Sequence, residues 1–208
     1  MASITLYGTP ISTYVRTVRL LLTEAGMDHD VVDIGIFNGD NQTDDYLQKQ
    51  PFGKIPVVEV DGTQLYETSA ITRYLDGLAA GKFTPSDLLP QARMQQVISI
   101  IDNYLYPPAV GTIVIQRLVV PQSGGTPDEP AIQQAIAPVK KALEAIESLC
   151  VGTPFLLGPD INLADFHLIP IFVYLSNTKE FGTVTAQTPK LRAWWEQIKT
   201  RESVKQVC

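Results

Sequence analysis

The chain has 208 residues, of which 45% are hydrophobic and 18% are charged, and its formal net charge is −6. A chain of this length and hydrophobic content can bury a substantial core as one domain or two small ones. Its acidic balance argues against a nucleic-acid or anionic-membrane surface, because both require a basic face.

The first elements follow a β-α-β order. Residues 3–7 are predicted as a short strand, residues 13–25 have the apolar spacing of a helix that stops at Gly26, and residues 30–34 are predicted as the next strand. This order predicts a parallel strand pair with a right-handed crossover, as in thioredoxin-like folds. The polar segment from Phe37 to Lys49 is expected to be an irregular or weak helix near the surface.

A tight hairpin and a helix start follow without a spacer. Residues 57–60 and 63–66 are β-compatible runs, and Asp61-Gly62 between them favours a type I′ turn, in which both positions need φ > 0. The apolar residues after the hairpin recur at helical spacing, at Ile71, Tyr74, Leu75 and Leu78. We therefore predict a two-stranded hairpin that leads directly into a helix.

Pro56 stands at the start of the first hairpin strand, where it cannot donate a hydrogen bond to a ladder. A cis Ile55–Pro56 bond would turn the N–H and C=O of Val57 outward, ready to pair with an extended peptide. The alternative is an ordinary trans proline at a strand edge, which is the commoner form. The functional interpretation is a site for a small peptide-like ligand.

Glu67, Thr68 and Ser69 lie at the start of the next helix. The free N–H groups and the dipole of a helix N-terminus attract a carboxylate. Glu67 could bind an ammonium group while Thr68 or Ser69 binds the carboxylate, so that together they hold a free α-amino-acid end. The alternative is a simple helix cap.

The pattern changes after residue 79. Residues 80–87 have the composition of a linker, and from Leu88 the chain shows long helical runs without a convincing strand. We therefore expect an α/β thioredoxin-like domain over residues 1–79 followed by an all-α helical domain over residues 88–208. One helical run should bend or break at Pro107-Pro108, and another should bend at Pro138.

Two further features of the helical half are interpreted as structural. Asn162 and Asp165 have the spacing of a variant capping box at the start of an apolar helix, and we assign both to folding. Trp194 and Trp195 lie in the last predicted helix, over residues 191–207, where core packing is the expected role.

Metal and membrane sites are not predicted. Cys150 and Cys208 are far apart and the chain has two histidines, so neither a dithiol site nor a zinc site is indicated. The N-terminus lacks the segments of a secretion signal, and the uncharged stretches over residues 103–116 and 166–178 are too short to span a membrane. We expect a cytoplasmic protein.

The ordered set of Pro56, the Asp61-Gly62 hairpin and Glu67-Thr-Ser-Ala-Ile71 resembles the glutathione-binding half of the cytosolic glutathione transferases. In that family the proline is cis, the residue after it pairs through its backbone with the cysteinyl part of glutathione, and a Glu-Ser pair holds the γ-glutamyl end. The resemblance implies that glutathione, as co-substrate and with no cofactor, is bound by Ile55, Pro56, Val57, Glu67 and Thr68. Thr68 stands where the family usually has serine.

The chemistry implied is presentation of the glutathione thiol as a thiolate. A thiol with a pKa near 8.5 is about 3% ionised at pH 7, and one hydrogen bond to the charged form, worth about 1.5–3 kcal/mol, is the right size to change that. Gly8-Thr-Pro-Ile-Ser12 resembles the serine-type, phi and theta-like members, which implies Ser12 as the catalytic hydroxyl. The alternatives are that Ser12 only caps the helix, or that Tyr7 contacts the thiol.

The resemblance also covers the glycine end of glutathione, which normally meets basic side chains. Lys54 fits that role. Asn41-Gln42 occupy the place where serine-type classes often carry a His-Lys pair, and this departure weakens the expected hold on the glycine carboxylate.

The assembly and activity implied are those of the family. Phe52 lies where some members insert an aromatic ring into a partner subunit, which implies a homodimer, although Phe52 could instead pack beneath its own loop. The implied activity is conjugation of glutathione to hydrophobic electrophiles, with a pocket formed by the first helix, the Phe37 segment and helices around residues 106–113. The alternative is a glutathione-binding or interaction module with little turnover.

Overall fold

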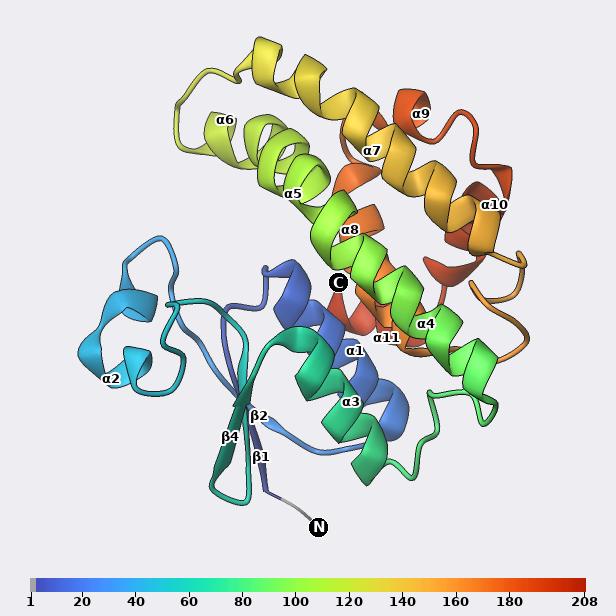
Figure 1. Cartoon of the computed structure of the whole chain (residues 1–208). Helices are drawn as coiled ribbons and strands as arrows, with labels where there is room; N and C mark the ends of the chain where they lie inside the picture. The colour runs from blue at the N-terminus through green and yellow to red at the C-terminus, as the bar shows by residue number, and fades with distance from the viewer. Residues whose placement is uncertain (1–2) are drawn as a thin grey trace. The chain divides into compact units, whose positions relative to one another are not determined.

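The computed structural model describes residues 3–208 (Figure 1). The chain forms two compact units. The first ends at Lys82 and also takes in Lys205–Cys208, and the second is Phe83–Val204. The change of unit between Lys82 and Phe83 falls within the stretch over residues 80–87 that has the composition of a linker.

The first unit is built on a four-stranded sheet with the order β2-β1-β3-β4. Its strands are β1 (Ile4–Tyr7), β2 (Asp30–Val32), β3 (Val57–Val60) and β4 (Thr63–Tyr66). β1 pairs parallel with β2 and antiparallel with β3, which pairs antiparallel with β4. Asp61 and Gly62 have φ values of 48° and 81°, as a type I′ turn requires. The predicted β-α-β order and hairpin are confirmed.

Two helices, α1 (Thr13–Ala25) and α3 (Thr68–Leu78), lie together on one face of this sheet (Figure 1). Alternate strand residues such as Leu6 and Val58 point to the helices and are fully buried with Val15 and Ile71. The segment between β2 and β3 contains only the short turns η1 (Asp40–Gln42) and α2 (Asp44–Leu47). The expected weak helix is therefore present, and it lies on the side of the strands away from α1 and α3.

The second unit is helical. A continuous run comprises α4 (Leu88–Ile100), η2 (Ile101–Leu105), α5 (Tyr106–Pro108), η3 (Ala109–Val119) and α6 (Val120–Gln122). It is followed by α7 (Glu129–Leu149), α8 (Leu163–Leu175), α9 (Phe181–Val184) and α10 (Pro189–Ile198), and by α11 (Glu202–Val207) at the boundary with the first unit. The prolines at 107 and 108 do not end the long helix. Wider π-helical turns flank them in η2 and η3, which is a form in which a helix absorbs a local interruption of its hydrogen bonding.

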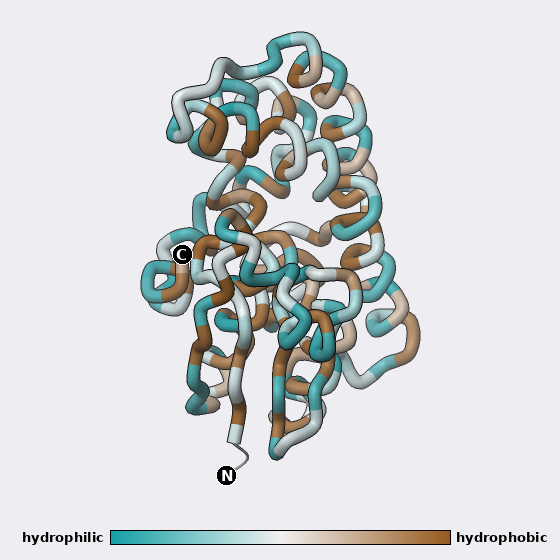
Figure 2. The backbone as a smooth tube through the Cα atoms, turned by 90° about the vertical axis from the view of Figure 1, so that its left-hand side faces the viewer, coloured by the Kyte–Doolittle hydropathy of each residue, from teal (hydrophilic) through white to brown (hydrophobic). Residues whose placement is uncertain are grey.

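The long run Leu88–Gln122 has the length and mean hydropathy of a membrane-spanning helix. Residues such as Ile101, Leu105 and Ile113 on this run are fully buried, and the run packs against α7 and α8 within its own unit. Figure 2 shows that polar and apolar residues alternate along much of the chain. The apolar content of the run is therefore that of a core helix.

The buried helix α8 is held by the predicted cap. The Asn162 side chain accepts a hydrogen bond from Ala164 N–H, and Asp165 accepts one from Asn162 N–H, so the capping box is confirmed. Asp165 is fully buried and also accepts from Leu156 N–H and, at 2.8 Å, from Trp194 Nε1. Its carboxylate thus joins the start of α8 to α10, and the predicted core role of Trp194 is confirmed.

Candidate functional site

The Ile55–Pro56 bond is cis, as the functional interpretation of this corner required. Val57, however, does not present its backbone. It begins the central strand β3, where it pairs with Tyr7 of β1 and Tyr66 of β4, and it is fully buried. The N–H and C=O of a central-strand residue face its neighbouring strands. The expectation that Val57 offers its backbone to a peptide is therefore corrected.

The open backbone belongs to Ile55. Within residues 3–208 neither its N–H nor its C=O has a hydrogen-bond partner, and its side chain is half-buried. An N–H and a C=O on one residue are the pair that an extended peptide needs to add itself to a strand edge. Ile55 thus takes the pairing role that sequence reasoning gave to Val57.

Gly8 brings the turn before α1 next to this open backbone. Its φ of +152° favours glycine, and a Cβ placed there would lie 2.5 Å from Val15 Cγ2 and 3.4 Å from Ile55 Cβ. The absence of a side chain lets the β1–α1 turn pass beside Ile55. Gly8, in the turn that leads into α1, therefore lies close to Ile55.

Ser12 caps α1 with its hydroxyl oxygen, and its hydroxyl hydrogen is not used for the cap. It has an extended backbone, and its Oγ accepts a hydrogen bond from Val15 N–H at the long distance of 3.5 Å. Its hydroxyl hydrogen has no acceptor within residues 3–208, and the side chain is half-buried. A hydroxyl can accept and donate at once, so the capping role leaves a donor available.

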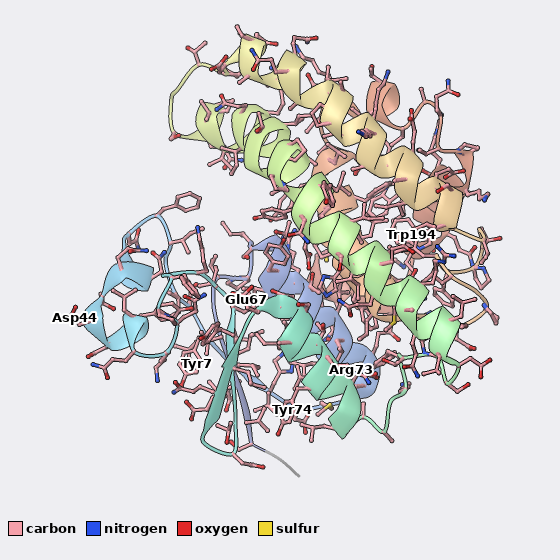
Figure 3. All side chains as sticks on the ribbon, viewed as in Figure 1. Tyr7, Asp44, Glu67, Arg73, Tyr74 and Trp194 are labelled. Atoms are coloured by element: carbon pink, nitrogen blue, oxygen red, sulfur yellow. The ribbon has the colours of Figure 1, made fainter. Side chains whose placement is uncertain are left out.

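The rival, Tyr7, uses its hydroxyl elsewhere. Its hydroxyl donates to Glu59 Oε2 at 3.4 Å, and Lys49 Nζ lies 5.0 Å from its ring centroid. Burial, together with the Glu59 carboxylate, raises the pKa of Tyr7. Tyr7 lies on the sheet face away from α1 and α3 (Figure 3). This arrangement favours Ser12 over Tyr7 as the donor to a thiol.

Glu67 stands at the N-terminus of α3 in a strained conformation. Its φ is 68° and its ψ is 112°, it makes no side-chain cap, and its carboxylate is exposed (Figure 3). A non-glycine residue in this region costs of order 1–3 kcal/mol, and such residues cluster at ligand sites. The strain is an independent indication that Glu67 serves a ligand.

Thr68 follows Glu67 as the first residue of α3 and is buried, yet its hydroxyl has no hydrogen-bond partner within residues 3–208. The first backbone hydrogen bond of α3 runs from Ile71 N–H to Glu67 C=O, so the earlier N–H groups lack a backbone partner. These donors together suit a carboxylate.

The loop before Pro56 is fixed by side chains that the sequence did not identify. Gln50 is fully buried and its Oε1 accepts from the N–H of Phe52 at 2.6 Å and of Lys54 at 3.3 Å. Tyr46 donates its hydroxyl to Lys54 C=O at 2.7 Å. The backbone of Lys54 is thus fully used, while the residue, which directly precedes Ile55, is exposed. No residue spacing indicated Gln50 or Tyr46, because both act across a turn.

Asn41 and Gln42 support the same loop. Asn41 Nδ2 donates to Gly53 C=O at 2.6 Å and Gln42 Nε2 donates to the same oxygen at 3.4 Å. Gly53 has φ +60°, a conformation that glycine adopts without cost. Within the described chain no group of three histidine, cysteine or carboxylate side chains is placed to hold a metal.

Comparisons with known proteins identify the family of the chain. The family model for the N-terminal domain of glutathione S-transferase matches residues 6–83, and that for the C-terminal domain matches residues 129–196. Glutathione S-transferase 3 of Zea mays is 32% identical over 207 residues, covering 97% of this chain and 91% of the relative, and glutathione S-transferase 1 of Zea mays is 30% identical, covering 100% and 96%.

Solved structures are similar over the same length. Glutathione transferase F7 from Populus trichocarpa superposes with a TM-score of 0.86 at 31% identity, covering 98% of this chain and 97% of that one. Glutathione S-transferase I in complex with an atrazine glutathione conjugate superposes with a TM-score of 0.84 at 27% identity, covering 99% and 96%.

Proposed function

Because the chain belongs to the glutathione S-transferase family, we propose that it conjugates reduced glutathione to hydrophobic electrophiles, with Ser12 holding the glutathione sulfur as a thiolate. The observation that carries this proposal is the unused hydroxyl hydrogen of Ser12, which follows the turn that Gly8 brings beside the open backbone of Ile55. The atrazine conjugate bound by one relative supports the electrophile class.

The tripeptide binds in an extended form. Its cysteinyl residue pairs with the N–H and C=O of Ile55, and its γ-glutamyl end reaches the N-terminus of α3. There the Glu67 carboxylate takes the ammonium group, and the Thr68 hydroxyl and the free N–H groups of the first turn take the α-carboxylate. Lys54 lies on the glycine side.

Ser12 acts on the charge of the sulfur. Its hydroxyl donates to the thiolate, and the α1 N-terminus adds a favourable dipole. A hydrogen bond to a charged group, worth about 1.5–3 kcal/mol, lowers the pKa of the bound thiol by roughly one to two units. The thiol proton leaves to solvent, and the thiolate then forms a sulfur–carbon bond with the electrophile, whose leaving group departs with the bonding electrons where one is present.

A homodimer is part of the proposal. The Phe52 side chain is 67% exposed and meets Tyr66 edge to face, with 6.3 Å between ring centroids, so it does not pack beneath its own loop. Tyr74 and Leu78 on α3 are also exposed large apolar residues of this unit. Exposed aromatic rings are enriched at the centres of protein interfaces.

The test combines binding, turnover and titration. We expect retention on immobilised glutathione, activity toward a chloronitrobenzene, and thiolate absorbance of the bound glutathione at neutral pH, well below the pKa of the free thiol. Retention without turnover across several electrophile types would favour a binding module instead. No heat of association with millimolar reduced glutathione in calorimetry would refute the proposal.

A further inference from the structure

β2 is an open edge of the four-stranded sheet, because it is the last strand in the order β2-β1-β3-β4 and pairs only with β1. Gly8 N–H donates to Val32 C=O at 2.9 Å, so the backbone of Val32 faces β1. The backbone groups of successive strand residues face opposite sides, so the N–H and C=O of Val31 face away from the sheet. Within residues 3–208 no backbone group pairs with Val31 on that side. Val31 therefore has the two groups to which an extended segment can add as a further strand.

Both faces of this edge are apolar and partly exposed. Val31 is level with Leu6, on the face that α1 and α3 cover, and Val32 is level with Tyr7, on the opposite face. The two valine side chains are 39% and 41% exposed. An added strand would therefore gain apolar contacts on both faces of the sheet as well as hydrogen bonds.

Carboxylates surround this edge without cations. Asp30 lies within β2, Asp28 lies two residues before it, and Asp33 directly follows the strand. All three are exposed, and within residues 3–208 none of their side chains forms a hydrogen bond or an ion pair. Between Arg19 and Lys49 the sequence has seven acidic residues and neither lysine nor arginine. The potential along β2 is therefore negative, and it favours a cationic partner.

The same charge disfavours other occupants of the edge. If β2 paired with β2 of a second copy, Asp30 and Asp33 would face carboxylates, and like charges opposite each other destabilise a strand pair. The net charge of −6 on the whole chain opposes such an approach further, and it also repels nucleic acids. Charged residues on a short edge strand are a common protection against aggregation. When the charges have one sign, the edge remains open to segments of the opposite sign.

We propose that the β2 edge is a docking site for an extended basic segment of another protein. The segment pairs with the backbone of Val31 and places lysine or arginine side chains beside Asp28, Asp30 and Asp33. Backbone pairing contributes affinity, and the carboxylates select the charge of the partner. This surface shares no side chain with the thiol site, so the inference is independent of the proposed function.

The test uses the full chain and two short blocked peptides, one that alternates lysine with valine and one that alternates glutamate with valine. The lysine peptide should slow hydrogen exchange of the Val31 N–H about tenfold at about ten times its dissociation constant. The glutamate peptide should not bind. NMR measures the exchange of each amide, and the amides of β4, at the other edge of the sheet, should not change. The inference is overturned if the lysine peptide does not bind, if both peptides bind equally, or if binding leaves Val31 unprotected.

A charge reversal tests the selection by sign. Asp30→Lys combined with Asp33→Lys should weaken binding of the lysine peptide at least about tenfold, because two exposed attractions become repulsions, and it should allow the glutamate peptide to bind. Asp44→Lys combined with Asp45→Lys makes the same change of charge on α2 and is the matched control, with an effect of about twofold or less. An equal effect of the two double variants would mean that the edge does not select the peptide.

A pair of variants at Val31 tests the backbone pairing. Val31→Pro removes the outward N–H without removing a hydrogen bond of the sheet, and it should weaken the lysine peptide at least about tenfold. Val31→Thr keeps the N–H and a β-branched side chain, and it should bind the peptide like the parent protein. Circular dichroism checks that both variants fold. A folded Val31→Pro protein with the affinity of Val31→Thr would show that the peptide does not pair with β2.

Discussion

At the scale of single residues, Ser12 combines a structural and a chemical role in one oxygen. The lone pair that caps α1 accepts from Val15 N–H, and the hydrogen remains for a ligand. The two alternatives that the sequence left open, cap or donor, are therefore compatible. Both roles place the hydroxyl at the end of a helix where negative charge is favoured.

Replacing this hydroxyl should separate turnover from binding. We expect Ser12→Ala to raise the pKa of bound glutathione by about one to two units, because it removes a hydrogen bond to the thiolate worth about 1.5–3 kcal/mol. Turnover at neutral pH should fall about 10- to 100-fold. Thiolate absorbance against pH measures the shift, and calorimetry should show a much smaller change in glutathione affinity.

Ser12→Thr is the matched control, because it keeps the hydroxyl at the cap position. It should retain the low pKa of the bound thiol. Loss of the cap in Ser12→Ala should cost about 1 kcal/mol of unfolding free energy, which thermal unfolding reports separately. An unchanged thiol pKa in Ser12→Ala would move the role to another donor.

Glu67 carries strain that a structural role alone does not explain. Its φ of 68° lies in the region that glycine adopts freely, and its side chain forms no cap, hydrogen bond or ion pair within the described chain. The strain lowers the free energy of unfolding, and the proposed benefit is that the Glu67 carboxylate lies beside Thr68 and the start of α3.

Glycine at position 67 should therefore make the protein more stable and make it bind glutathione more weakly. Glu67→Gly relieves the strain, and we expect the unfolding free energy to rise by about 1 kcal/mol. It also removes the carboxylate proposed to bind the ammonium group, so KM for glutathione should rise at least tenfold. Glu67→Ala should show the same rise in KM without the gain in stability. A Glu67→Gly variant with unchanged KM would contradict the role in binding.

At the scale of elements, the start of α8 is stabilised by the fully buried carboxyl group of Asp165. Asp165 accepts hydrogen bonds from Leu156, Asn162 and Trp194, which partly stabilise its charge. Burial is the larger effect, and it raises the pKa of Asp165 from 3.8 to about 6. The folded protein therefore keeps this proton in a pH range where the unfolded chain has released it.

This shift gives stability a definite pH dependence. The contribution of Asp165 is greatest below about pH 4 and is lost as pH rises to about 6, because the unfolded chain releases the proton first. A rise of about two pKa units corresponds to about 3 kcal/mol. Asp165→Asn does not titrate, so its deficit in unfolding free energy relative to the parent should be larger at pH 4 than at pH 7.

Denaturant unfolding at several pH values measures this difference, and other carboxylates cancel in the comparison. Asp160→Asn, at an exposed position in the preceding loop, is the matched control and should leave the pH profile unchanged. A deficit that grows with pH would mean that the Asp165 carboxylate is ionised in the folded state at pH 4.

At the scale of the whole molecule, the first unit has several large apolar side chains exposed on its surface. Phe52 is 67% exposed, and Tyr66, Tyr74 and Leu78 are 38%, 40% and 44% exposed. Phe37, at 68%, lies on a separate loop between β2 and η1. The two exposed phenylalanines thus offer a matched comparison between a proposed interface residue and a surface one.

We expect Phe52→Glu to shift the protein from dimer to monomer, because loss of an aromatic anchor and burial of a charge each oppose association, together by at least about 2 kcal/mol. Light scattering over a concentration series measures the weaker dimerisation. Phe37→Glu should leave the dimer intact. A parent protein that is monomeric at micromolar concentration would refute the homodimer directly.

The sequence by itself determined the local elements of this protein. The β-α-β order, the Asp61-Gly62 hairpin and the capping box at Asn162 follow from residue periodicity and turn preference, which act over a few neighbouring residues. The start of α3 at Glu67 was located in the same way, whereas Ser12 was singled out by the resemblance to serine-type members of the family. At Pro107-Pro108 the sequence left a bend or a break open, and the structure shows a continuous helix with widened turns that packs against α7 and α8.

Only the tertiary structure decided which atoms of the site are free. The sheet encloses Val57 between β1 and β4 and leaves the backbone of Ile55 open, while Asn41 and Gln42 are used by Gly53. Trp194 meets Asp165 although 29 residues separate them. Which donors and acceptors pair with each other depends on how distant segments pack. A group that is already paired within the protein is not available to a ligand.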